Sequence, residues 1–290
     1  MKLIVTGSRS FIGKALRRAC QRRGIGWFGI DLLPPAAQDE IQADICVPEL
    51  AARLPRDATA LVHLAAVSRD TDCRRDPTGA FRVNVGGTLN LIRAAKKAAV
   101  PQFLFASSEW VYGDVDPSLK SEETVIDANA VASEYPLTKL AGERLLWIAS
   151  REGLNVTVLR FGIVYGPRTN AASAVESLCL AVRDKDRIEV GSLATARRFI
   201  HVEDVADGIL AAAGRSPGYE LLNLTGNDLI SLAMIIEASC RQWSRTPEVV
   251  ELSPRTASVR NIDNAKARRT LGWGPRLSLA EGLATLAGRP

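Results

Sequence analysis

The chain alternates short apolar runs with longer stretches of helical periodicity, and this pattern limits the folds open to it. The apolar runs cover residues 3–6, 27–30, 61–64, 102–106 and 157–160. The amphipathic stretches cover residues 11–23, 77–99 and 134–152. Strands that are apolar along their whole length, with helices between them, are typical of a parallel sheet buried on both faces. The sequence therefore predicts an α/β fold with a doubly wound parallel sheet.

The rhythm changes after residue 166, where Ala, Ser and charged residues become more frequent. We expect a helix near 205–214, a strand near 221–224, and helices around 232–242 and 263–271. The pattern indicates a smaller, interwoven C-terminal substrate lobe. The predicted division is a dinucleotide-binding domain over 1–165, with 199–230 packing back on it, and a substrate-binding lobe over 166–290.

Composition argues against several classes of protein. The net charge is +5, but the basic pairs are scattered and no run of five or six appears, so nucleic acid is not the expected partner. A modest basic excess also suits a phosphate-bearing substrate. The five cysteines are far apart and only two histidines occur, which argues against disulfides and metal sites. With no signal peptide and no membrane-spanning run, we expect a cytoplasmic protein.

A glycine-containing turn follows the first predicted strand. Gly7 and Gly13 enclose Ser8-Arg9-Ser10-Phe11-Ile12, and a predicted helix follows. A strand, a glycine turn and a helix N-terminus can bind a pyrophosphate, with Gly7 permitting the tight turn and Gly13 the close packing. Ser10 stands where a middle glycine is usual, so an ordinary strand–helix corner remains open as an alternative.

Asp31 strengthens the dinucleotide interpretation. It closes the second strand, about twenty residues after the turn, where a carboxylate bonds both ribose hydroxyls of NAD and repels the 2′-phosphate of NADP. Arg9 opposes this, since its guanidinium could reach such a phosphate. We predict NAD as the cofactor; a turn cap is the alternative role for Asp31.

Tyr135 and Lys139 lie four residues apart, on one face of a predicted helix. A cationic Lys beside the phenol lowers the pKa of Tyr, so that it can take a proton from a hydroxyl. Ser108 ends a predicted strand, where its hydroxyl could hold a substrate oxygen. Without the other motifs, Tyr135 and Lys139 could be a surface pair, and the Ser108 hydroxyl could cap the backbone at the strand end.

Together these motifs resemble the extended short-chain dehydrogenase/reductases, and more narrowly the NAD-dependent sugar epimerase/dehydratase family, whose nucleotide-binding domain is Rossmann-like. The resemblance continues through His63-Leu64-Ala65-Ala66, Asn84-Val85-Gly86-Gly87-Thr88, 159–168, 197–206 and 260–275. It implies a catalytic Ser108, Tyr135 and Lys139, with Glu109 as a further acid. The cofactor contacts that it implies are Gly7, Arg9, Ser10, Phe11, Ile12, Gly13, Asp31, Leu32, Asp44, Ile45, Leu64, Ala65, Ala66, Asn84, Ala106, Ser107, Tyr135, Lys139, Phe161, Gly162 and Val164. The implied substrate contacts are Ser68, Ser108, Trp110, Ile163, Arg168, Arg197 and Arg260.

The two arginines Arg197 and Arg260 match a clamp on the diphosphate of a nucleotide-sugar. Surface solvation, or an ion pair of Arg197 with Glu203 or Asp204, is the alternative. Ile163 replaces an Asn that contacts substrate in many nucleotide-sugar enzymes. Trp110 stands where the dehydratases of the family carry an acidic base, so a 4,6-dehydratase is disfavoured. Its side chain would form an apolar wall beside the substrate, and a core aromatic is the alternative.

We therefore expect an NAD-dependent nucleotide-diphosphate-sugar 4-epimerase or 4-keto reductase/dehydrogenase. The alternatives are an oxidoreductase of a non-sugar alcohol or ketone, which Ile163 favours, and a non-catalytic dinucleotide sensor. The resemblance also implies a homodimer that pairs the helices near 77–99 and 134–152.

Overall fold

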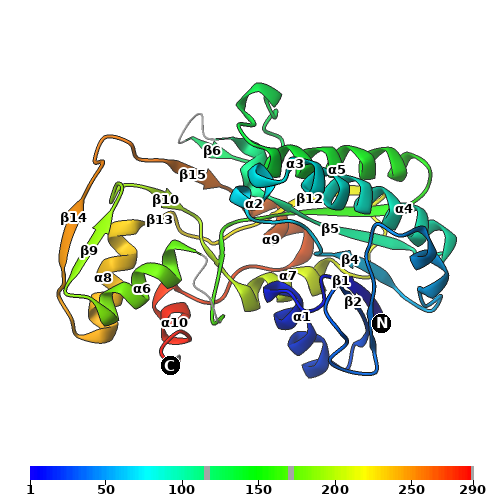
Figure 1. Ribbon diagram of the computed structural model, residues 1–290, viewed down its shortest axis with the longest axis horizontal. Helices are drawn as coiled ribbons and strands as arrows, with labels where there is room; N and C mark the ends of the chain where they lie inside the picture. The colour runs from blue at the N-terminus through cyan, green and yellow to red at the C-terminus, as the bar shows by residue number, and fades with distance from the viewer. Residues whose placement is uncertain (114–117, 169–172, 289–290) are drawn as a thin grey trace. The chain divides into compact units, whose positions relative to one another are not determined.

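A computed structural model describes residues 1–113, 118–168 and 173–288 of the chain. The chain divides into two compact units that are interleaved in sequence (Figure 1). Unit 1 comprises Met1–Gly113, Val125–Arg160 and Ala206–Leu222, and unit 2 comprises Asp114–Thr124, Phe161–Val205 and Asn223–Pro290. The assignment of the two units to cofactor and to substrate stays a prediction.

Unit 1 is built on a seven-stranded sheet in the order β12-β7-β5-β4-β1-β2-β3. The strands are β1 (Lys2–Thr6), β2 (Gly26–Asp31), β3 (Glu40–Gln42), β4 (Ala60–His63), β5 (Gln102–Ser108), β7 (Asn155–Phe161) and β12 (Tyr219–Leu224). The pairs β1–β2, β1–β4, β2–β3 and β4–β5 are parallel. The predicted doubly wound α/β fold is confirmed, and its strand order reverses at β1, where such sheets bind ligands.

Helices connect these strands. They are α1 (Phe11–Arg22), α2 (Asp70–Arg75), α3 (Pro77–Phe81), α4 (Thr88–Lys97), α5 (Glu134–Arg151) and α7 (Val202–Ala212), with 3₁₀ turns at Pro48–Arg53, Glu109–Tyr112 and Ala128–Ala130. Figure 1 shows α1 on the opposite side of the sheet from α4 and α5.

The helix predicted over 77–99 is confirmed from Pro77 to Lys97, and a π-helical turn, Arg82–Gly87, lies within it between α3 and α4. The Thr88 hydroxyl donates to the Asn84 carbonyl at 2.6 Å inside this turn. The Gly86-Gly87 pair also lowers the local preference for a regular helix. π-helical turns of this kind are frequent at functional sites.

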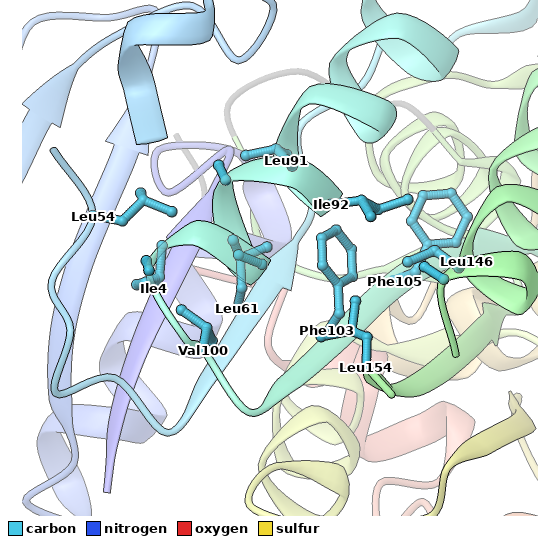
Figure 2. Close-up of a cluster of buried hydrophobic side chains, with 14 of the residues drawn as sticks. Ile4, Leu54, Leu61, Leu91, Ile92, Val100, Phe103, Phe105, Leu146 and Leu154 are labelled. Carbon is cyan, nitrogen blue, oxygen red and sulfur yellow. The ribbon is translucent and has the colours of Figure 1, made fainter. Parts of the chain in front are cut away.

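The core of unit 1 joins the sheet to α4 and α5. Figure 2 shows Leu61, Phe103 and Phe105 from β4 and β5 facing Ile92 of α4 and Leu146 of α5. These side chains are at most 5% exposed. Burying each contributes about 1.5–3 kcal/mol to stability, so α5 is held firmly against the strand ends.

In the described residues of unit 2 there are three smaller sheets, β13-β10-β15-β6, β11-β8 and β14-β9. The strands are β6 (Leu119–Lys120), β8 (Val164–Tyr165), β9 (Arg187–Val190), β10 (Ala196–Arg197), β11 (Ile200–His201), β13 (Ile230–Ser231), β14 (Glu248–Glu251) and β15 (Val259–Ile262). The helices are α6 (Ala174–Asp184), α8 (Leu232–Trp243), α9 (Ala265–Leu271) and α10 (Leu279–Ala284). Helices α6, α8 and α10 share one apolar core. Across the described residues, no helix combines the length and apolar character needed to cross a membrane.

Candidate active site

The glycine turn after β1 forms a tight backbone cradle. Gly7 has φ +68°, and a Cβ there would lie 2.8 Å from the Ala65 nitrogen. A Cβ on Gly13 would lie 2.4 Å from the Gly7 carbonyl oxygen and 2.6 Å from that of Ser8. Both contacts are with backbone, so these two positions require glycine.

Ser10 is the N-cap of α1. Its backbone nitrogen donates to the Gly7 carbonyl at 3.0 Å, and its hydroxyl oxygen accepts from the Gly13 nitrogen at 3.1 Å. The serine thus satisfies one N–H group at the helix end, which a glycine would leave unpaired. Phe11 and Ile12 follow in partly buried positions, and the positive end of the helix dipole lies at the turn.

Asp31 lies against the same turn. Its Oδ2 accepts from the Arg9 backbone nitrogen at 2.9 Å, and its Oδ1 accepts from that of Leu33 at 3.1 Å. The capping role is therefore real, and each carboxylate oxygen keeps capacity for a further donor. The Arg9 guanidinium donates to the Pro34 carbonyl. Leu32, the next predicted contact, is 64% exposed.

Other predicted cofactor contacts line the same end of the sheet. The Asp44 carboxylate accepts from the Cys46 nitrogen at 2.9 Å and from the Arg82 guanidinium at 3.2 Å. Ile45 is buried, and its side chain lies against Gly87. Directly after β4, Leu64, Ala65 and Ala66 are partly buried, whereas Ser68 is exposed.

The structure brings Ser108, Tyr135 and Lys139 together. Ser108 ends β5, and its side chain interacts with that of Tyr135. Lys139 lies one turn further along α5, with its Nζ 5.8 Å from the centre of the Tyr135 ring. The same Nζ donates to the Ala106 carbonyl at 2.8 Å, which holds the ammonium under the end of β5.

Burial sets the protonation of this group. It raises the pKa of Tyr135 to about 12, although the hydrogen bond with Ser108 lowers it. It also lowers the pKa of Lys139 to about 8, although Cys73 and Glu143 raise it. Lys139 is therefore mainly a cation at neutral pH, and this positive charge favours the phenolate of Tyr135.

A buried chain of hydrogen bonds, not foreseen from sequence, includes His63. The Thr88 hydroxyl donates to Asn84, so it accepts from His63 Nε2 at 3.0 Å. His63 Nδ1 then accepts from the Thr6 hydroxyl at 2.8 Å. Burial, helped by the charge of Lys139, lowers the pKa of His63 to about 3. His63 is thus a neutral link between β1, β4 and α4.

Asn84 continues this chain to α5. Its Nδ2 donates to the Val67 carbonyl at 2.9 Å and to Thr138 Oγ1 at 3.0 Å, and its Oδ1 accepts from the Val67 nitrogen. The Thr138 hydroxyl in turn donates to the Tyr135 carbonyl at 2.7 Å. Asn84 was expected from the resemblance to contact the cofactor; its bond to Thr138, next to Lys139, was not predicted.

The residues after β5 differ in exposure. Glu109 is fully buried, and Trp110 is only partly buried, which argues against the core-aromatic alternative for Trp110. The Ser107 hydroxyl donates to Glu143 Oε1 at 2.6 Å, so it has no second proton to donate to a ligand. Their predicted contacts with ligands stay predictions.

Unit 2 carries the predicted arginine clamp. Arg197 in β10 and Arg260 in β15 are direct register partners in a parallel pair, so their side chains share one face. Arg197 donates to the carbonyl and hydroxyl oxygens of Ser258 at 2.6 and 2.8 Å. Arg168 forms a bidentate ion pair with buried Glu176, at 2.8 and 3.0 Å.

Unit 2 resumes at Phe161, the last residue of β7, and the Phe161 side chain is buried. The Gly162 nitrogen donates to the Leu224 carbonyl at 3.0 Å. Ile163 accepts at its carbonyl from the Ile200 nitrogen at 3.0 Å and packs against the core of unit 2. Val164 starts β8, in register with Ile200. The Gly162 nitrogen and the Ile163 carbonyl are thus already used in backbone hydrogen bonds.

Comparisons with a family model, with curated proteins and with solved structures all find sequence or structural similarity to enzymes that act on nucleotide-sugars. Residues 3–224 match the model of the NAD dependent epimerase/dehydratase family. A UDP-glucose 4-epimerase of Mycolicibacterium smegmatis is 29% identical over 98% of this chain and 96% of its own length. A GDP-6-deoxy-D-mannose reductase of Pseudomonas aeruginosa is 28% identical over 98% and 95%. The solved structure of MoeE5 in complex with UDP-glucuronic acid and NAD has a TM-score of 0.87 at 29% identity, covering 99% of this chain and 97% of that one.

Proposed function

Because this chain belongs to the NAD-dependent epimerase/dehydratase family, we propose that it is a nucleotide-diphosphate-sugar 4-epimerase or 4-keto reductase/dehydrogenase. One observation supports this most: Tyr135 lies beside the ammonium of Lys139, whose Nζ donates to the Ala106 carbonyl at the carboxyl end of β5, the strand that Ser108 ends. Relatives named as a UDP-glucose 4-epimerase and as a GDP-6-deoxy-D-mannose reductase each match nearly the whole chain.

The residues of unit 1 fit NAD, the cofactor of the family. Gly7 and Gly13 leave the space that a Cβ would fill, and α1 points its N-terminus at this turn. Asp31 adds a carboxylate suited to ribose hydroxyls. When bound, NAD supplies the hydride acceptor for the carbon being oxidised.

The protein groups move the proton. Tyr135 takes the proton of the sugar hydroxyl, Ser108 holds the same oxygen by a hydrogen bond, and Lys139 stabilises the phenolate. Burial raises the pKa of Tyr135 to about 12, so the ionised phenol requires the positive charge beside it. On return, Tyr135 gives the proton back to the ketone oxygen.

Arg197 and Arg260 are the proposed recognition groups for the diphosphate. They share one face of β10 and β15, and guanidinium groups bind phosphate oxygens bidentately. Arg197 is held in place by Ser258, so little side-chain freedom is lost on binding.

The test is to measure bound NAD in the purified protein and then offer UDP-, GDP- and dTDP-hexoses with product analysis. A C4 epimer formed without net change in NADH indicates the epimerase, and stoichiometric NADH consumption or formation indicates the reductase/dehydrogenase. Turnover of a simple alcohol but of no nucleotide-sugar would overturn the proposal.

Asp31→Asn is expected to weaken NAD binding about tenfold, because a hydrogen bond to a charged group is lost. Affinity for NADP should rise relative to NAD, since the carboxylate no longer repels its 2′-phosphate. The amide oxygen can still accept from the Arg9 nitrogen, so the turn should persist. Fluorescence titration with both cofactors measures this, with Asp57→Asn, in an exposed ion pair with Lys2, as control. An unchanged NAD/NADP ratio would contradict the role of Asp31.

We also propose a homodimer that uses α5. Leu137, Trp147 and Ile148 of this helix are 44%, 44% and 51% exposed. Trp147→Glu is expected to halve the mass measured by light scattering, from about twice 31.3 kDa to one chain. Leu252→Glu, at a residue 61% exposed in unit 2, is the control and should leave the mass unchanged. A Trp147→Glu protein that stays dimeric would contradict this interface.

A further inference from the structure

A buried ion pair lies next to the catalytic strand end. Glu143 of α5 is 0% exposed and Arg160 of β7 is 2% exposed. Arg160 Nε donates to Glu143 Oε1 at 2.9 Å, and its Nη2 donates to Oε2 at 2.7 Å. Apolar residues in place of such a pair often leave a protein equally stable, because both charges lose their hydration. Stability alone therefore does not explain these two residues.

The Glu143–Arg160 pair contacts one residue before Ser108 in the sequence and one residue after it. Ser107, its neighbour in β5, donates from its hydroxyl to Glu143 Oε1 at 2.6 Å. On the other side, the Arg160 guanidinium carbon lies 4.7 Å from the ring centre of Tyr112, which ends the turn that Ser108 caps. The peptide that carries Ser108 is thus held before and after this residue.

Glu143 also lies one helical turn after Lys139. Its negative charge raises the pKa of Lys139, against the larger effect of burial. The other groups facing Lys139 are the Cys73 thiol of α2, the neutral His63 of β4 and the Tyr135 phenol. Burial raises the pKa of Cys73 above its ordinary value, so it is a neutral thiol at pH 7. Glu143 is the carboxylate in this set.

We propose that the Glu143–Arg160 pair is a positioning device for Ser108, Tyr135 and Lys139, an inference that rests on the function proposed above. Neither residue needs to touch substrate. Glu143 acts through Ser107 on the catalytic strand end and through its charge on the ammonium of Lys139. Arg160 orients the Glu143 carboxylate through two hydrogen bonds. One carboxylate thereby joins α5, β5 and β7 at the catalytic group.

The test compares Glu143→Gln with the parent holoenzyme. NMR of protein labelled with ¹³C in its lysines follows the Lys139 Cε signal against pH, assigned by its loss in Lys139→Met. The parent midpoint should lie near 8. In Glu143→Gln it should fall by about half a unit or more, because loss of an anion disfavours the cation. The alkaline limb of kcat/KM should move to lower pH with it, and kcat should fall about tenfold or more while KM changes little.

A second variant keeps the inference testable if Glu143→Gln, which leaves a buried cation, does not fold. The double variant Glu143→Leu/Arg160→Met removes both charges and should fold. It should show a lowered midpoint, by less than Glu143→Gln because the Arg160 cation is removed as well, and a similarly lowered kcat. Asp207→Asn, which breaks the 2.7 Å pair with Arg23 elsewhere in unit 1, is the control and should change neither.

A folded variant with the parental Lys139 midpoint and kcat would overturn the inference and leave the pair a structural contact. Failure of the proposed function is distinguishable from this result. If the parent turns over no nucleotide-sugar, that function fails, while the NMR midpoint, which needs no substrate, still decides the inference.

Discussion

Tyr135→Phe is expected to lower kcat about a thousandfold, since the variant removes the only atom proposed to exchange a proton with the sugar hydroxyl. NAD affinity should stay within about threefold of the parent, because a hydroxyl deletion leaves the glycine turn and Asp31 unchanged. The ring still fills the same partly buried position, and the Ser108 hydroxyl still accepts from the Trp110 nitrogen. Steady-state kinetics and fluorescence titration with NAD measure the two effects.

The matched control is Tyr219→Phe. Tyr219 lies in β12 of the same unit, and its hydroxyl has no hydrogen-bond partner among the described residues. This variant should keep parental kcat and KM. Full activity of Tyr135→Phe would refute the mechanism even if the substrate proves to be a nucleotide-sugar.

Gly13→Ala is expected to cost about 1–3 kcal/mol of stability and to weaken NAD binding about tenfold or more. The added Cβ would meet the carbonyl oxygens of Gly7 and Ser8 at 2.4 and 2.6 Å, so the backbone of the turn itself must move. This movement displaces the helix end that faces a pyrophosphate. Thermal unfolding with and without NAD, together with direct titration, measures both changes.

Gly191→Ala is the control for this variant. A Cβ at Gly191 meets no atom within 4 Å, so the substitution should leave NAD affinity and the unfolding midpoint near those of the parent. A Gly13→Ala protein that binds NAD as the parent does would show that the cofactor does not use this turn.

Local patterns along the chain were enough to predict the strands β1, β2, β4, β5 and β7, because an apolar run of four or five residues is a strong signal by itself. The three-residue strand β3 was missed, since a run that short carries no periodicity. The π-helical turn within the helix over 77–97 was missed too. Asn84 in this turn bonds to Val67, a contact across 17 residues of chain that no local pattern reports.

Prediction from local sequence has the same limit for the candidate catalytic residues. Tyr135 and Lys139 are four residues apart, so their shared helix face follows from helical geometry. That Ser108 meets them depends on the packing of α5 against β5, with Phe105 and Leu146 in the core between them.

The order of residues along this chain thus settled the fold class, the glycine turn and the candidate acid–base residues, because each depends on spacing within a few helical turns or one strand. Three features depended on the folded chain. They are the capping of the Arg9 and Leu33 nitrogens by Asp31, the neutral His63 that links β1 to α4, and the buried Glu143–Arg160 pair beside Ser107. Each joins segments distant in sequence, and burial, which no local pattern reports, sets their charge and hydrogen bonding.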